Sequence, residues 1–322
     1  MTTYVDESSS DSRYHFRPFT MSTPAVASTS AQASVRASDE AIDITPITSS
    51  QLLEGFGDQI RKFSGISGLR SAVNTLSNHL YQGTTTNQYL VLQPVTEEDL
   101  AEIEDQHHNL GRGLRLTHCA DIDTLIIKVP TPEHERVAGI FAEEVTTWRV
   151  RMGLTRQDFG SFRSTKFRGT STSKEADECF RPGARPHRLD SPTLVFEVGV
   201  SESLPKLRND ARWWLSNSQG LVRIVLIFHV NRGSRAILIE KWECTPAART
   251  YAIRSNRPPA QIPTQMHTIT IDSNGITATP ALPLVLHFQN LLLRQPTPPE
   301  QDLIFTAQDL QNLANDIWAC LL

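Results

Sequence analysis

Apolar residues recur with two different periods along this chain, which predicts a mixture of helices and strands. Over 51–82 they recur every three or four positions, and the period breaks near Gly65 and Gly68, so two helices are expected there. The clearest helix should run from Pro132 to about Met152, because proline suits a first turn and the apolar residues form one stripe. Further helices are predicted from Thr96, over 204–215 and from Thr306 onward.

Short apolar runs without a helical period predict the strands. They lie at 89–92, 124–127, 162–167, 192–200, 222–230 and 236–242. A hairpin is expected around Asn274-Gly275, a dipeptide favoured in tight turns, whereas 284–293 fits either a strand or a helix. The order of helix, strands, helix and strands predicts an α/β (α+β) fold with a mixed central sheet flanked by helices.

The first fifty residues have a different composition from the rest of the 322-residue chain. Eighteen of them are Ser or Thr and none is Lys, so residues 1–50 are expected to form a disordered tail. The start of the chain lacks the basic and apolar regions of a signal peptide, and no run approaches the roughly 18 apolar residues of a membrane span. We expect an intracellular protein with four reduced cysteines, in nucleus or cytoplasm.

Two carboxylates about twenty residues apart are the most informative chemical feature. Glu197 follows the apolar run 194–196, and an ionised group in such a strand is costly unless a cation or another partner compensates it. Asp177 precedes it, and Glu144 falls near the centre of the apolar stripe of the helix at 132–152. Mg²⁺ prefers such oxygen ligands, so Glu144, Asp177 and Glu197 are candidate metal ligands for phosphodiester hydrolysis.

The candidate site lacks a lysine at the position that shares a strand face with Glu197. Residue 199 is Gly, and Lys206 on the following helix is the nearest lysine that could stabilise charge developing on a phosphate. Lys174, Arg208 and Arg212 are candidates for contacts with nucleic acid. Trp213 and Trp214 are interpreted as core residues.

The net charge of −4 is unevenly distributed, and basic residues surround Asp177. Segment 149–188 contains Arg149, Arg151, Arg156, Arg163, Lys166, Arg168, Lys174, Arg181, Arg185 and Arg188. This excess fits either a nucleic-acid contact or a solvated basic loop.

These residues resemble the PD-(D/E)XK nuclease superfamily, and in particular a restriction-endonuclease-like branch found in filamentous fungi. The similarity covers about 125–245 well and 283–318 more weakly, and its signature is 192–203 followed by 207–215. It implies a restriction-endonuclease-like core, with Asp177 as the motif aspartate, Glu197 as the second acid and Glu144 as the acid of the first helix. Ala176 replaces the motif proline and Gly199 the motif lysine.

The resemblance leaves three hypotheses. The first is a Mg²⁺-dependent nuclease acting on DNA, with Asp177, Glu197 and Lys206 as catalytic residues, since some branches of the superfamily carry the lysine on the following helix. The second is an inactive nuclease-like module that binds nucleic acid or a protein, as other branches have lost catalysis. The third is an unrelated α/β scaffold whose acids form structural ion pairs.

The predicted organisation has four regions, and the oligomeric state is left open. They are a tail at 1–50, a mainly helical region at 51–120, a nuclease-like core at 121–250, and strands with a helix that pack on the core at 251–322.

Overall fold

The structure is a computed structural model that describes residues 44–163, 165–187, 189–200, 203–247 and 259–321. Its α-helices are α1 (Ser49–Leu52), α2 (Gly65–Tyr81), α3 (Glu97–Asp105), α4 (His107–Leu110), α5 (Pro132–Arg151), α6 (Leu204–Asn217), α7 (Phe288–Leu292) and α8 (Ala307–Cys320). Short 3₁₀ turns, η1 and η2, lie at Gly57–Gln59 and Ala120–Ile122. Within these residues no helix has the length and apolar character needed to cross a membrane.

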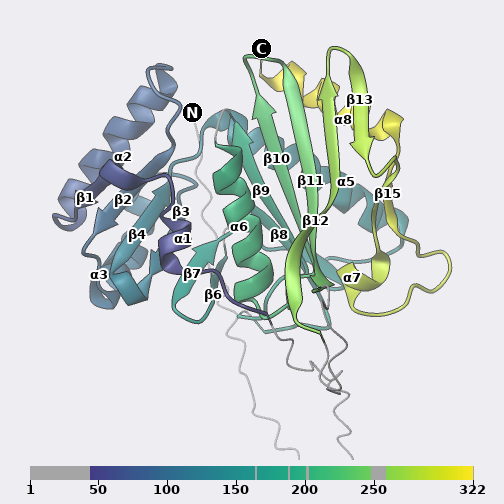
Figure 1. Cartoon of the computed structure of the whole chain (residues 1–322), viewed down its shortest axis with the longest axis horizontal. Coiled ribbons are helices and arrows are strands. Elements are labelled where there is room, and N and C mark those ends of the chain that lie inside the picture. Colours follow the sequence, from purple (N-terminus) through teal and green to yellow (C-terminus); the bar gives the residue numbers. More distant parts are fainter. Residues whose placement is uncertain (1–43, 164, 188, 201–202, 248–258, 322) are drawn as a thin grey trace, which may run out of the picture. The chain divides into compact units, whose positions relative to one another are not determined.

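The strands form two large sheets and a small pair (Figure 1). The first sheet has the order β1 (Ile60–Lys62), β2 (Tyr89–Gln93), β4 (Thr124–Lys128), β3 (Arg115–Cys119), β7 (Thr172–Glu175) and β6 (Lys166–Arg168). The second has the order β13 (Gly275–Thr279), β12 (Gln261–Asp272), β11 (Ala236–Pro246), β10 (Ile224–Asn231), β9 (Leu194–Val200), β8 (Glu178–Pro182) and β5 (Phe159–Ser161). The pair is β14 (Leu284–Leu286) with β15 (Leu303–Phe305).

The second sheet is mixed, and its connections follow the order predicted for a restriction-endonuclease-like core. α5 precedes β5, which pairs antiparallel with β8, and β8 pairs antiparallel with β9. β10 then runs parallel to β9, which requires a crossover, and α6 supplies it. The predicted mixed α/β fold is therefore confirmed.

Strand β9 divides its side chains between two apolar cores. Leu194, Phe196 and Val198 point to the core shared with α5 and α8, whereas Val195 belongs to the core shared with α6. Because side chains alternate along a strand, Glu197 and Gly199 lie on the α6 side with Val195. The acid of β9 thus faces α6 and the first sheet.

The first sheet alternates in the same way, and this places cations opposite that acid. Leu90, Leu116 and Ile127 pack with α2, α3 and α4 in a separate apolar core. Lys128 is the cross-strand partner of both Tyr89 and Arg115 on the other face. That second face is turned toward the second sheet.

Several boundaries differ from the sequence prediction. Only one long helix forms over 51–82, because Gly55 turns the chain at a φ of +88° and leads into η1 and β1. Ile47 is buried and its N–H donates to the side chain of Asn217, so residues 44–50 belong to the fold, while 1–43 lie outside the described residues. The first sheet joins strands from before and after residue 120, where the sequence predicted a boundary between two regions. The division of the chain into four regions stays a prediction.

We predict that Phe141→Ala lowers the free energy of unfolding by about 3–5 kcal/mol. The Phe141 ring packs against Phe196, Phe228 and Phe305, with centroid distances of 4.7, 4.4 and 5.1 Å. Urea unfolding measures the change. Val150→Ala on the same helix is the control, since Val150 is exposed and its truncation should change stability by less than about 0.5 kcal/mol. Equal effects of the two variants would contradict this packing.

Candidate functional site

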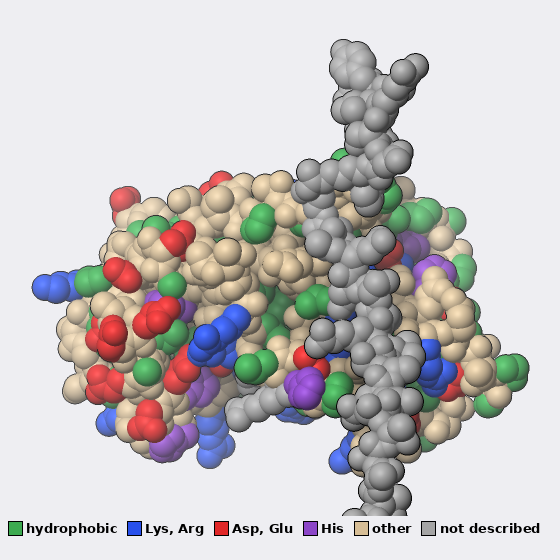
Figure 2. Space-filling view, turned by 90° about the horizontal axis from the view of Figure 1, so that it is seen from below, with side chains coloured by type: hydrophobic (Ala, Val, Ile, Leu, Met, Phe, Trp, Pro, Cys, Tyr) green, Lys and Arg blue, Asp and Glu red, His purple; other side chains and the backbone are tan. Residues whose placement is uncertain are grey.

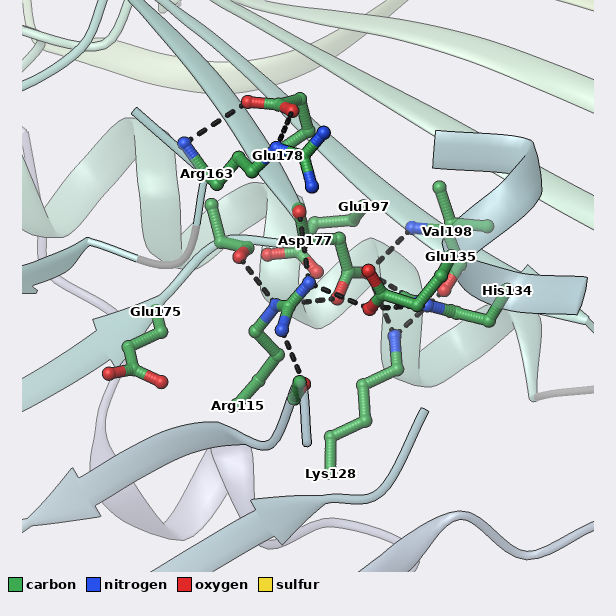
Figure 3. A network of polar contacts seen from close by, with 12 residues as sticks. Arg115, Lys128, His134, Glu135, Arg163, Glu175, Asp177, Glu178, Glu197 and Val198 are labelled. Atoms are coloured by element: carbon green, nitrogen blue, oxygen red, sulfur yellow. Dashed lines mark hydrogen bonds and ion pairs between the residues drawn. The ribbon is translucent and has the colours of Figure 1, made fainter. Parts of the chain in front are cut away.

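Asp177 lies between the two sheets and is surrounded by cations (Figure 3). Its Oδ2 accepts hydrogen bonds from Lys128 Nζ and Val198 N–H, each at 2.9 Å, and lies 3.0 Å from His134 Nε2. Arg115 Nε lies 3.8 Å from Oδ1. All four side chains are buried, so their charges are compensated by one another rather than by water.

The charges around Asp177 hold it in the ionised form. Burial alone would raise the pKa of its carboxyl group, but His134 and Lys128 hold that pKa well below its ordinary value. Conversely, burial alone would lower the pKa of His134, and the Asp177 carboxylate raises it instead. The Asp177–His134 contact is therefore an internal ion pair.

Arg115 ties this group to the backbone before β8. Its guanidinium donates to the carbonyl oxygens of Ala176 at 3.0 Å and Asp177 at 3.3 Å, and to Glu135 Oε1 at 2.8 Å. It also donates to the carbonyl oxygen of Gly113. A single side chain of the first sheet thus fixes the segment that carries Asp177.

Glu197 lies at the centre of a second, connected group. Its Oε1 accepts a hydrogen bond from the indole N–H of Trp214 and lies 3.4 Å from Lys174 Nζ. Lys174 Nζ also lies 3.2 Å from Asp210 Oδ1, which accepts from Lys206 Nζ at 2.7 Å. Lys174 therefore bridges the acids of β9 and α6.

Burial raises the pKa of Glu197 to about 7, although the neighbouring Lys174 ammonium opposes the shift. Lys174 itself is buried, which disfavours its charge, yet the Asp210 and Glu197 carboxylates raise its pKa. For Asp210, burial is outweighed by Lys174 and Lys206, which lower its pKa. Of Asp177, Glu197 and Asp210, Glu197 is therefore the acid that changes its protonation state near neutral pH.

The structure brings together some of the residues that the sequence singled out and separates others. Asp177, Glu197, Lys206 and Lys174 line one small cavity. Glu144 does not join them. It is exposed on α5, and its nearest charged neighbours include Asp309 and Asp316 of α8, so it lies on the α8 side of the helix.

Of the three candidates for contacts with nucleic acid, two are engaged within the fold and one is exposed. Lys174 is buried in the ion-pair network and is not a surface contact. Arg208 is held by Glu240, to which Nε donates at 3.1 Å and Nη2 at 2.5 Å. Arg212 is exposed, with its guanidinium 5.5 Å from the ring centroid of Trp242, so it remains available to a partner.

The basic segment 149–188 is largely used within the fold. Arg149 donates to the carbonyl oxygen of Phe159 and Arg185 to that of Leu221. Arg181 lies over the ring of Phe162 at 3.8 Å. Arg188 lies outside the described residues. The excess of positive charge read from this segment is therefore in good part structural.

Sequence reasoning missed Arg115, Lys128 and His134, the three cations nearest Asp177. Lys128 directly follows the apolar run 124–127, just as Glu197 follows 194–196. A charged residue at the end of a buried strand was the pattern that could have identified Lys128. Arg115 lies on a short strand with a polar sequence, and His134 lies in a helical first turn, so neither has a recognisable pattern.

The described residues do not fit a Mg²⁺ ion in this arrangement. Mg²⁺ requires near-octahedral oxygen coordination and keeps several waters. The cavity beside Asp177 and Glu197 has a volume of about 10 Å³, enough for about one water. Asp177 Oδ2 is already engaged by protein groups, and the described part of the chain contains no group of three or more His, Cys, Asp or Glu suited to a metal.

Comparisons with known proteins assign neither a family nor an activity to the chain. No protein-family model and no curated protein matches the chain. A matching solved structure is a candidate nuclease belonging to DUF820 from Anabaena variabilis, with 9% sequence identity and a TM-score of 0.36. The match covers 62% of this chain and 90% of that one. At these values the similarity assigns no activity, and the fold assignment rests on the element order above.

We predict that Glu197→Gln changes the pH dependence of stability. The folded protein binds a proton at Glu197 up to about pH 7, whereas the unfolded chain releases it near the ordinary pKa of 4.5. Stability contributed by the protonated form is thus lost as pH rises from 4.5 through 7. Relative to the variant, the wild type should lose on the order of 3 kcal/mol between about pH 4.5 and pH 8 in urea unfolding.

The matched control for this experiment is Glu143→Gln, which alters an exposed carboxylate on α5. Its stability should follow that of the wild type at every pH. If Glu197→Gln instead became less stable than the wild type as pH rose, the buried carboxylate would be favoured in its ionised form and our assignment would be wrong.

Proposed function

We propose that this protein is a nuclease-like module that binds nucleic acid without cleaving it. The observation that carries the proposal is the engagement of both motif acids by the protein itself. Asp177 is compensated by Lys128, His134 and Arg115, and Glu197 by Trp214 and Lys174. One oxygen of each acid, Asp177 Oδ2 and Glu197 Oε1, is used in this way, and position 199 carries no lysine.

Nucleic acid is favoured over a protein partner by a hollow next to the acid centre. It is lined by aromatic Tyr89 and by Lys206, a combination suited to bases and phosphates. A broad electrostatic attraction to DNA is less favoured, because acidic side chains gather over the end of the molecule that carries α2 and α3 (Figure 2). On the face shown there, Lys and Arg side chains are separated from one another. We therefore expect nucleic acid to bind at this hollow rather than along a broad basic surface.

The alternative function is Mg²⁺-dependent hydrolysis of DNA, and one observation favours it. Asp177 Oδ1 has no hydrogen-bond partner among the described residues, although it is buried. A rearrangement that separated the two sheets would expose this oxygen together with Glu197. The same experiment distinguishes the two functions.

The test combines calorimetric titration with Mg²⁺ and incubation with plasmid and single-stranded DNA. We expect DNA binding by mobility shift, no heat from Mg²⁺ and no cleavage, because no site for a hydrated ion is present in the described residues. Wild type, Glu197→Gln and the control Glu143→Gln should behave alike toward the metal. Cleavage that requires Mg²⁺ and is lost only in Glu197→Gln would establish the nuclease and refute our proposal.

A further inference from the structure

A hollow with a volume of about 690 Å³ borders the acid centre, and we call it the α6 pocket. It is built from three segments: the turn after α1, the start of β2, and the first turns of α6. Its lining residues are Glu54, Gly55, Phe56, Gln59, Thr86, Asn87, Gln88, Tyr89, Ser203, Pro205, Lys206 and Asn209. A volume of this size accommodates a small organic ligand.

The lining combines aromatic rings, carboxamides, one ammonium group and the exposed carboxylate of Glu54. Phe56 and Tyr89 pack edge to face, with ring centroids 5.3 Å apart, and Lys206 Nζ lies 5.8 and 5.5 Å from the two centroids. Gln59, Asn87, Gln88 and Asn209 contribute the carboxamides. Aromatic and carboxamide side chains are those that contact bases and pair with their edges.

Gln88 provides an independent sign of a missing partner. Its side chain is only 2% exposed, and Nε2 donates to the carbonyl oxygen of Val200 at 3.4 Å. Its Oε1 is buried and accepts no hydrogen bond from any described residue. A buried acceptor without a donor is costly, and a ligand bearing an N–H group would supply one once a rotation of the Gln88 side chain turned this shielded oxygen into the pocket.

The α6 pocket adjoins the acid centre at two side chains. Tyr89 and Lys206 line both the pocket and the small cavity that contains Asp177 and Glu197. Lys206 donates to Asp210 at 2.7 Å, which uses one of the three protons of its ammonium group. An anion at the inner end of the pocket could therefore contact Lys206.

We propose that the α6 pocket binds one unpaired nucleotide of a single strand, with its base against Tyr89 and Phe56 and its phosphate on Lys206. The base would donate to Gln88 Oε1 from an exocyclic amino group, as in adenine, cytosine and guanine, or from the ring N–H of thymine, so this contact recognises a base without selecting among the four. The inference rests on the proposed function and deepens it, because it names the form of nucleic acid and the site that receives it.

A neighbouring hollow extends the pocket along α6 and favours a strand over a free nucleotide. It has a volume of about 280 Å³, shares Glu54 and Asn209 with the α6 pocket, and includes Arg212. Arg212 is exposed, and its Nη1 donates to Asn209 Oδ1 at 3.1 Å. A strand that leaves the pocket in this direction meets a second cation for its next phosphate.

The experiment measures binding of labelled oligodeoxynucleotides of about six nucleotides to the full chain by fluorescence anisotropy. Oligo-dA should bind about tenfold more tightly than an abasic strand of the same length, and Gln88→Leu should reduce that difference. Thr86→Trp places a bulky side chain at an exposed lining position and should weaken every oligonucleotide about tenfold or more. Arg112→Met, at an exposed residue outside the pocket lining, is the control and should bind like the wild type.

Competition with dAMP and inorganic phosphate identifies what the pocket recognises. We expect dAMP to compete, though more weakly than the oligonucleotide, and phosphate to compete least. Equal competition by phosphate and dAMP would show an anion site without base recognition and would overturn the inference. Thr86→Trp keeps the test decisive if Gln88→Leu fails to fold, because Thr86 is not part of the core.

Failure of the inference is distinguishable from failure of the proposed function. DNA binding that is unaffected by Thr86→Trp would overturn the pocket assignment and leave the binding module in place. Binding of dAMP without binding of any DNA would support the pocket and overturn the module. No binding of either would refute both.

Discussion

The compensation of Asp177 by buried cations is the interaction on which the arrangement of the two sheets depends. The carboxylate belongs to the chain just before β8 of the second sheet, whereas Lys128 and Arg115 belong to the first. A buried ion pair is weakly stabilising as a whole, but removal of one partner leaves an uncompensated charge at a cost of several kcal/mol. The strand register that turns these cations inward therefore places them where they compensate Asp177, beside the apolar contacts between the two sheets.

The same compensation determines what the acids can do. Nuclease chemistry of the expected kind uses carboxylates that are free to bind a hydrated metal and a lysine that faces them. Here Glu197 shares its strand face with Gly199, and the lysines that contact Asp177 and Glu197, which are Lys128 and Lys174, come from the first sheet. They form ion pairs with the acids, and the cavity beside them has a volume of only about 10 Å³. In the function proposed above, the fold therefore supports the neighbouring α6 pocket rather than a hydrolytic site.

The sequence predicted the parts of this structure that depend on local pattern. The helix at 132–151, the helix at 204–217 and the strand bearing Glu197 have strong apolar periods, and all three were found. Glu144 was predicted near the centre of the apolar stripe of 132–152, but it is exposed on α5 with Asp309 and Asp316 of α8 among its charged neighbours, because the stripe packs against α8 as well as against the sheet. The partners of Asp177 were missed because they depend on cross-strand register and on the contact between sheets, which a single sequence does not encode in its spacing.

A double-mutant cycle on Asp177→Asn and Lys128→Met tests the central claim most directly. Each single variant should lose about 3–5 kcal/mol in urea unfolding, because it leaves a buried charge without its partner. The double variant should lose less than the sum, with a coupling free energy of about 2 kcal/mol or more. The same cycle with the exposed Lys62→Met should be additive. Additivity of Asp177 and Lys128 within about 0.5 kcal/mol would contradict an acid centre compensated by the protein itself.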